Sequence, residues 1–199
     1  MRYVRFLLPV LFLISPLGFA QTKNESTDLG KPFEADLASG GDLRMELRSG
    51  EFHIVGGDEN KIVIHVTGRN ADKANEVKVS LRRSDNNAEL HISGGPRNDL
   101  AFDISVPKNV KLFLRMFAGE LDVHGISGSK DIELHFGELR ITLGSLGDYA
   151  HVDASVTSGA LDADPFGINK GGLFRSFEKD GKGSYRLHAH VGAGQITLD

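Results

Sequence analysis

The sequence predicts an all-β, single-domain fold of the β-solenoid type, a β-helix-like stack of short strands. The first observation is a unit that recurs along the chain: a strand-like run, a glycine, and a short alternating strand. The second is the content of 24 glycines and 6 prolines, which indicates many tight turns. The third is that only residues 72–76 have the character of a helical turn. The glycines, each with the apolar residues two and four positions later, are Gly50, Phe52, Ile54; Gly119, Leu121, Val123; Gly137, Leu139, Ile141; Gly159, Leu161, Ala163; Gly194, Ile196, Leu198.

The fixed spacing within this unit has a physical reason. Alternate residues of a strand point to the same face, so both apolar residues of a unit face one way. One unit cannot bury that face alone, and stacked units would bring the equivalent residues Phe52, Leu121, Leu139, Leu161 and Ile196 into one column. A β-sandwich is the alternative, since it also has many short strands, but it does not require the same register at every glycine.

The N-terminal segment 1–20 is interpreted as a secretory signal peptide. Arg2 and Arg5 precede an apolar run from Phe6 to Phe19, and Gly18 and Ala20 are small residues before a cut after position 20. A retained membrane anchor is the alternative, although the run is shorter than the ~20 apolar residues that span a bilayer. Segment 21–41 is then a polar leader, ordered late or docked as a cap.

The predicted domain covers residues 42–199 and begins with alternating strands. The apolar residues that define these strands are Leu43, Met45, Leu47; Ile62, Ile64, Val66; Val77, Val79, Leu81; Leu90, Ile92; Leu100, Phe102, Ile104, Val106; Val110, Leu112, Leu114, Met116. Residues 84–87 are turn-forming, which predicts a hairpin insertion in the N-terminal part of the stack. Pro107 predicts a second turn.

Compact units follow, with a glycine-rich insertion at residues 165–184. The chain stops one residue after Leu198, inside the final unit. An uncapped strand edge invites pairing with another chain, so we expect weak self-association through this C-terminal edge.

Composition excludes several functions. Without Arg2 and Arg5 the chain has 21 basic residues against 27 acidic ones, which argues against binding to nucleic acid or to an anionic membrane surface. No later stretch is apolar enough to insert in a membrane after signal removal. The absence of cysteine excludes disulfides, thiol chemistry and thiolate metal sites. No cofactor is predicted.

Two stretches carry a family resemblance. Phe102 to Val123, with its Val-Pro-Lys-Asn turn and Gly-Glu-Leu-Asp-Val end, and Gly183 to Leu198, which ends in Gly-Gln-Ile-Thr-Leu, resemble the "putative adhesin" domain of many exported bacterial proteins. The likeness covers residues 41–199. It implies a β-helical, exported single domain of undefined role, and the family has no catalytic motif to carry over.

Two groups of residues are candidates for metal binding or acid–base chemistry, and each also fits an ordinary solvated strand or turn. His188 and His190 lie on one strand face and are candidate metal ligands, with Asp153, His151 or His135 as a third ligand. Asp162 and Asp164 are paired carboxylates that suit Ca²⁺ or acid–base cleavage of sugars. The bland interpretation of both groups is a solvated strand face or turn. No nucleophile elbow or phosphate loop is present.

The insertion at 165–184 combines aromatic and basic side chains, and long loops on rigid scaffolds often carry binding sites. Its binding-loop candidates are Phe166, Phe174, Arg175 and Phe177. The alternative is that the aromatic residues fold back and close the end of the stack.

These features favour an exported, non-enzymatic β-solenoid, adhesin-like or structural, located in the periplasm or at the cell surface. Its partner is an unidentified protein or glycan. One alternative is a carbohydrate-acting or metal-dependent enzyme that uses Asp162, Asp164, His188 and His190. Another is an envelope signalling accessory protein that binds a second protein.

Overall fold

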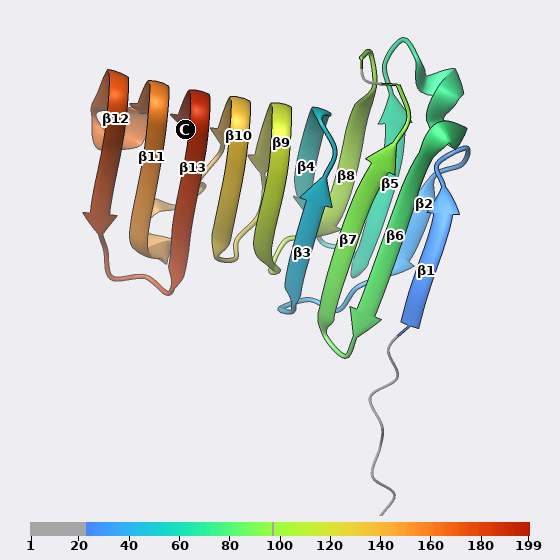
Figure 1. Ribbon diagram of the computed structural model, residues 1–199. Coiled ribbons are helices and arrows are strands. Elements are labelled where there is room, and N and C mark those ends of the chain that lie inside the picture. Colours follow the sequence, from blue (N-terminus) through green and yellow to red (C-terminus); the bar gives the residue numbers. More distant parts are fainter. Residues whose placement is uncertain (1–22, 97) are drawn as a thin grey trace, which may run out of the picture.

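The all-β prediction is confirmed by the computed structural model, which describes residues 23–96 and 98–199. The strands form one 13-stranded sheet that does not close on itself (Figure 1). Segment 1–20, interpreted as a signal peptide, lies outside the described residues. Among the described residues no helix is long and apolar enough to cross a membrane.

The elements follow one another along the chain with three short 3₁₀ turns between strands. Their bounds are β1 Lys23–Asp28, β2 Phe33–Asp36, β3 Asp42–Leu47, β4 Gly50–Gly57, β5 Lys61–Thr67, η1 Ala71–Glu76, β6 Val77–Ser84, β7 Asn87–Gly94, β8 Ala101–Pro107, β9 Lys111–His124, β10 Lys130–Ile141, η2 Leu146–Asp148, β11 Tyr149–Ala163, η3 Asp164–Phe166, β12 Ile168–Asp180 and β13 Tyr185–Leu198. The helical turn expected at 72–76 is η1, and the expected hairpin is β6–β7 with Ser84 opposite Asn87.

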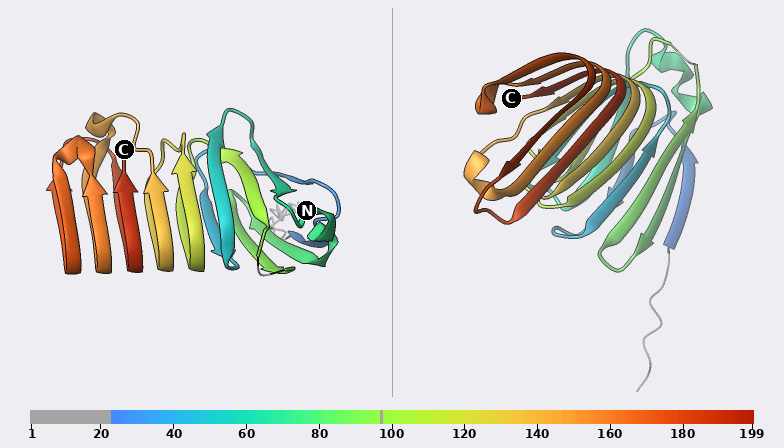
Figure 2. Two further views of the ribbon diagram at one scale, coloured as in Figure 1. Left: turned by 90° about the horizontal axis from the view of Figure 1, so that it is seen from above. Right: turned by 60° about the vertical axis from the view of Figure 1, so that its left-hand side comes forward.

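The long strands bend sharply, which folds the sheet into two layers (Figure 2). In the first layer the order is β1, β6, β7, β3, then the first halves of β9, β10, β13 and β11 and the second half of β12. The second layer contains β2, β5, β8 and β4, followed by the remaining halves of the same long strands. The core lies between the layers.

The bend falls at the repeated glycines, which lie side by side in the register Gly50–Gly119–Gly137–Gly194–Gly159. Their φ angles range from +129° to +159°, a region that side-chain-bearing residues rarely adopt. A Cβ on Gly137 would lie 1.9 Å from the backbone oxygen of Gly119, so the strands approach too closely there for any side chain. Gly119, Gly159 and Gly194 have equally close backbone neighbours, so at these positions the repeated glycine has a steric cause.

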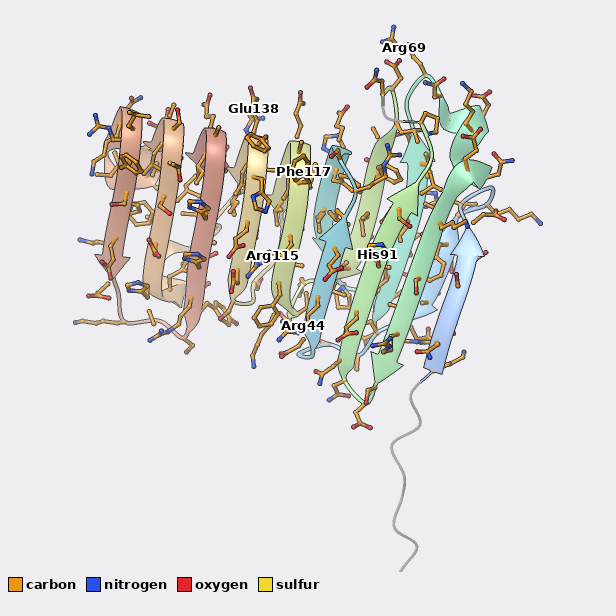
Figure 3. All side chains as sticks on the ribbon, viewed as in Figure 1. Arg44, Arg69, His91, Arg115, Phe117 and Glu138 are labelled. Atoms are coloured by element: carbon orange, nitrogen blue, oxygen red, sulfur yellow. The ribbon has the colours of Figure 1, made fainter. Side chains whose placement is uncertain are left out.

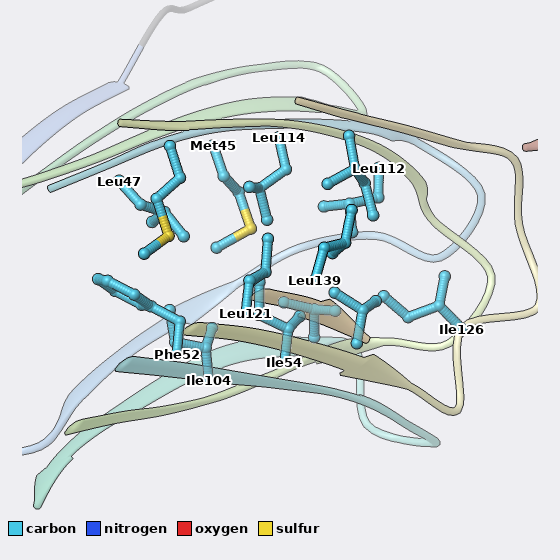
Figure 4. Packing of buried hydrophobic residues seen from close by; sticks show 14 of the residues in the cluster. Met45, Leu47, Phe52, Ile54, Ile104, Leu112, Leu114, Leu121, Ile126 and Leu139 are labelled. Atoms are coloured by element: carbon cyan, nitrogen blue, oxygen red, sulfur yellow. The ribbon is translucent and has the colours of Figure 1, made fainter. Parts of the chain in front are cut away.

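The apolar column predicted from the repeat is present, with a changed order. The register places Phe52, Leu121, Leu139, Ile196 and Leu161 in consecutive strands, and all are buried. Figure 4 shows three members of the column, Phe52, Leu121 and Leu139, facing buried residues of the first layer, which are Met45, Leu47, Leu112 and Leu114. Both layers thus contribute alternate residues to one core.

The expectation of an open C-terminal edge is wrong. β13 pairs in parallel with β10 on one side and with β11 on the other, so the last strand of the chain lies inside the sheet (Figure 1). Units that follow one another in sequence do not all stack in chain order, as a simple coil would require. The order of the strands in the sheet depends on pairing between segments that are distant in sequence, and the spacing of the repeat carries no information about it.

The segments outside the repeat form the two ends of the sheet. The described part of the 21–41 leader contains the edge strands β1 and β2, which pair with β6 and β5. The 165–184 insertion contains the end of η3 and all of β12, which runs antiparallel to β11 and forms the opposite edge.

We expect Leu139→Ala to lower the free energy of unfolding by about 2–5 kcal/mol, because it opens a cavity in the middle of the apolar column. Urea unfolding followed by circular dichroism measures the change. Arg140→Ala, one residue further on the exposed face, is the matched control and should stay within about 0.5 kcal/mol of the parent protein.

Candidate functional site

The outward side chains of the first layer form a charged face on β9, β10, β13 and β11 (Figure 3). Arg115 lies on β9, at one side of this face, and pairs with Asp131 at 3.0 Å and with Glu133 at 3.1 Å. On the next strands, His188 Nδ1 lies 2.9 Å from a carboxylate oxygen of Asp153. The face is therefore a network of mutually paired charges across adjacent strands.

The predicted histidine pair is split between different partners. His188 and His190 do share one strand face, but His190 Nδ1 lies 2.9 Å from the hydroxyl of Ser155, while His188 contacts Asp153. Of the third ligands considered, only Asp153 contacts either histidine; His151 pairs with Asp180 at 2.7 Å, and His135 packs against Phe117. The structure does not bring the two imidazoles onto one ion.

A different group comes closer to metal-binding geometry. Asp131, Glu133 and His188 offer ligand atoms within 4.8 Å of one another. Both carboxylates are already paired with the guanidinium of Arg115. An ion would have to displace that internal cation, so the arrangement is that of an ion-pair network.

A hollow of about 410 Å³ lies beside this network. Its lining includes Phe113, Lys130, Asp153 and Arg186. Arg44 covers the ring of Phe113 at 4.4 Å from its centroid, which leaves less aromatic surface for a ligand. The hollow is open and mostly bordered by groups that already have partners.

Lys130 is the buried charged residue of the described chain, with 2 % of its surface exposed. It points into the core between Leu112 and Leu187 and donates hydrogen bonds to Tyr149 Oη at 2.8 Å and to the Gly128 carbonyl at 3.1 Å. Burial lowers the pKa of Lys130 to about 8. Burial, followed by the charge of Asp148, raises the pKa of Tyr149 to about 12.

The residues proposed for an enzyme lie on opposite sides of the molecule. Asp162 follows the bend at Gly159 and projects from the second layer, where Asn169 donates to it at 3.4 Å. His188 and His190 precede the bend of β13 and project from the first layer. Asp164 begins η3 and is exposed. These four residues therefore do not form one site.

The binding-loop candidates of the insertion also separate. Phe177 is buried, and Phe166 packs against it with ring centroids 4.8 Å apart. Arg175 Nε donates to the Gly171 carbonyl at 2.8 Å. Phe174 is 80 % exposed and is the candidate among the four that is free to meet a partner.

Arg175 and Lys170 also protect the edge strand. Both occupy inward positions of β12, opposite Val156 and Leu161, and Lys170 Nζ donates to the Ser176 carbonyl across the bend at 2.9 Å. Inward charges on an edge strand oppose edge-to-edge association, because a second copy would bury them.

We expect the Lys170→Val, Arg175→Val double variant to self-associate through β12, with sedimentation velocity at several concentrations showing larger species. The control is Lys78→Val, Arg82→Val, which makes the same chemical change on the outward face of the interior strand β6. Equal sedimentation of the two double variants would contradict a protective role of the inward charges.

A second surface lies where the strands bend. We call it the crest: the two positions before the bend glycine of β9, β10, β13 and β11, and the two positions after Gly172 on antiparallel β12, that is 117–118, 135–136, 192–193, 157–158 and 173–174. Phe117 and Phe136 are 61 % and 50 % exposed, and their rings meet edge to face at 5.4 Å. Leu173, at 62 % exposed, lies beside Phe174 at the far end of the crest.

Sequence reasoning missed Phe117 and Phe136. For Phe117 the available signal was its phase, since it directly follows the inward residue Met116. Phe136 comes two residues after the inward residue Leu134 and so continues the alternation, and no local signal indicates that it is exposed. Large exposed apolar groups that gather on one surface mark interaction sites more often than isolated ones do. The crest is therefore the surface with the strongest binding character among the described residues.

Comparison with known proteins gives a fold-level likeness. The structure is similar to the crystal structure of a "putative cell adhesion protein" from Clostridium sporogenes ATCC 15579, with a TM-score of 0.53 and 14 % sequence identity over 89 % of this chain and 99 % of that chain. The sequence matches no protein-family profile and no curated protein. The comparison thus shows a shared fold.

Proposed function

We propose that this chain is an exported, non-enzymatic binding protein of the bacterial envelope with an adhesin-like role. In this proposal the bent, parallel strands act as one solenoid-like scaffold, and the crest is the surface that meets the partner. The observation that carries it is the group of exposed apolar side chains at Phe117, Phe136, Leu173 and Phe174 on a rigid ridge. The fold-level likeness to a protein described as concerned with cell adhesion supports the same role.

The distribution of reactive side chains supports binding over catalysis. The histidines and carboxylates proposed for an enzyme project from opposite layers, and those of the charged face are engaged with one another. A general acid–base site needs groups that converge on one reacting atom. The crest needs no such convergence, because apolar contact area is sufficient for binding.

Adhesion can be tested with beads that carry protein purified from expression of the full chain. Retention of the beads is measured on immobilised bacterial cell-wall fragments, mucin and extracellular-matrix protein, with albumin-coated beads as the control. We expect retention above the control on at least one surface. Equal retention on every surface would overturn the adhesive role.

Export is tested by cell fractionation, and the alternative of a metal-dependent enzyme is tested by metal analysis. Fractionation of cells that express the full chain should place it in the periplasm, the medium or the cell surface, and a purely cytoplasmic protein would overturn export. Metal analysis of the purified protein addresses the alternative, since a stoichiometric ion that is lost in His188→Ala would favour a metal-dependent function.

A further inference from the structure

The second layer carries a row of glutamates directly beside the aromatic end of the crest. Glu51, Glu120 and Glu138 are neighbours in the register of β4, β9 and β10, and the row continues to Gln195 on β13. All three glutamates are exposed. Neighbouring strands are about 4.8 Å apart, so the three carboxylates line up at close spacing.

This row is not neutralised within the described part of the chain. Glu51 lies 3.1 Å from His53, and neither Glu120 nor Glu138 has a basic side chain within ion-pair distance among residues 23–96 and 98–199. Like charges directly opposite one another on paired strands are destabilising. On the charged face, by contrast, the carboxylates of Asp131 and Glu133 both pair with Arg115.

Two locally unfavourable features therefore meet at one place. Phe117 precedes Glu120 by three residues and Phe136 precedes Glu138 by two, so exposed rings and unpaired carboxylates share the bends of β9 and β10. Neither feature stabilises the fold. Departures from local consistency of this kind concentrate at functional surfaces.

We propose that the crest binds an extended, basic and apolar segment of another protein. Apolar side chains of that segment would pack on Phe117 and Phe136, and its Lys or Arg side chains would pair with Glu120 and Glu138. This inference rests on the proposed binding function and names the surface and the partner chemistry. The acidic row disfavours nucleic acid, anionic glycans and anionic lipid surfaces as partners.

The floor of the crest fits an extended chain. Between Phe136 and Leu173 the crest residues are small, namely Ala193 and Ser158 in the same register, so the ridge dips between its two apolar ends. The crest runs from β9 to β12, which is four strand spacings, or about 19 Å. An extended segment of about six residues covers that length.

The probe is a fluorescein-labelled octapeptide of alternating lysine and leucine or phenylalanine, mixed with the full-chain protein and followed by fluorescence anisotropy. Two matched peptides replace every lysine by glutamate or every apolar residue by serine. We expect the basic apolar peptide to bind at least tenfold more tightly than either matched peptide, with an affinity that falls as salt is raised.

The protein variants locate the binding. Phe117→Ser with Phe136→Ser, and separately Glu120→Gln with Glu138→Gln, should each weaken binding at least tenfold, and the glutamine pair should also flatten the salt dependence. Glu46→Gln with Glu89→Gln removes the same charge from the opposite face and should change affinity less than twofold. Urea unfolding of each variant confirms that it is folded, because all these side chains are exposed.

Several results would overturn the proposal. These are equal binding of the basic and acidic peptides, or equal weakening by the crest and control glutamine pairs. Binding of Ca²⁺ that is lost in Glu120→Gln with Glu138→Gln, without peptide binding, would make the row a cation site instead. If bead retention persists in all crest variants, the adhesive role is retained but the crest is not the binding surface. This outcome distinguishes the two proposals.

Discussion

Gly137→Ala is expected to remove more than about 4 kcal/mol of folding free energy, enough to leave little folded protein. The added Cβ would lie 1.9 Å from the backbone oxygen of Gly119, and φ at this position is +129°. The obstructing atom belongs to the backbone of the neighbouring strand and cannot rotate away. Relief would require the strands to separate, which would break the parallel pairing on which the column of apolar residues depends.

Gly144→Ala is the matched control, because Gly144 also has a positive φ, +71°, but no atom lies within 4 Å of its added Cβ. This variant should lose only about 1–2 kcal/mol from the unfavourable backbone conformation. Urea unfolding and soluble yield compare the two variants. Similar stability of Gly137→Ala and Gly144→Ala would show that the strands do not approach as closely as the bend requires.

Lys130→Met is expected to raise the free energy of unfolding at pH 7 by roughly 1–3 kcal/mol, because it replaces a buried charge without a carboxylate partner by an apolar chain of similar length. Tyr149 keeps its hydrogen bond to the Leu143 carbonyl, so its hydroxyl is not left without a partner. The neighbouring inward residues Leu112 and Leu187 provide an apolar setting for methionine.

In the parent protein, the free energy of unfolding should depend on pH because of Lys130. The pKa of Lys130 is about 8 in the folded protein and 10.5 for a freely solvated lysine, so between these values the unfolded chain binds more protons and stability rises with pH. The rise from Lys130 is about 3 kcal/mol. Above pH 10 the raised pKa of Tyr149 reverses the trend, because the unfolded tyrosine loses its proton first.

Urea unfolding at pH 7 and at pH 9.5, in the parent protein and in Lys130→Met, covers the lower part of this window, where about 2 kcal/mol of the rise is expected. The variant should lack the rise, and Lys78→Met on the outward face of β6 should retain it. A rise of the same size in Lys130→Met would assign the effect to other groups.

The candidate site was less accessible to sequence reasoning than the fold. His188 and His190 were correctly placed on one strand face, since period-two alternation decides that locally. Their partners Asp153 and Ser155 come from β11, which is adjacent only because β13 inserts between β10 and β11. The expectation of a free C-terminal edge was wrong for the same reason, since β13 lies between β10 and β11. The crest was missed because an exposed phenylalanine and a buried one look alike until the bend is located.

By itself the sequence determined the all-β class, the repeated glycine unit and the apolar column, because strand alternation and glycine's backbone freedom act within a few residues. The tertiary structure decided the order of the strands, the burial of Lys130 and the meeting of exposed rings with unpaired glutamates. These depend on pairings between segments distant in sequence, which hydrogen bonding and burial select together across the whole sheet, and a local pattern does not encode them.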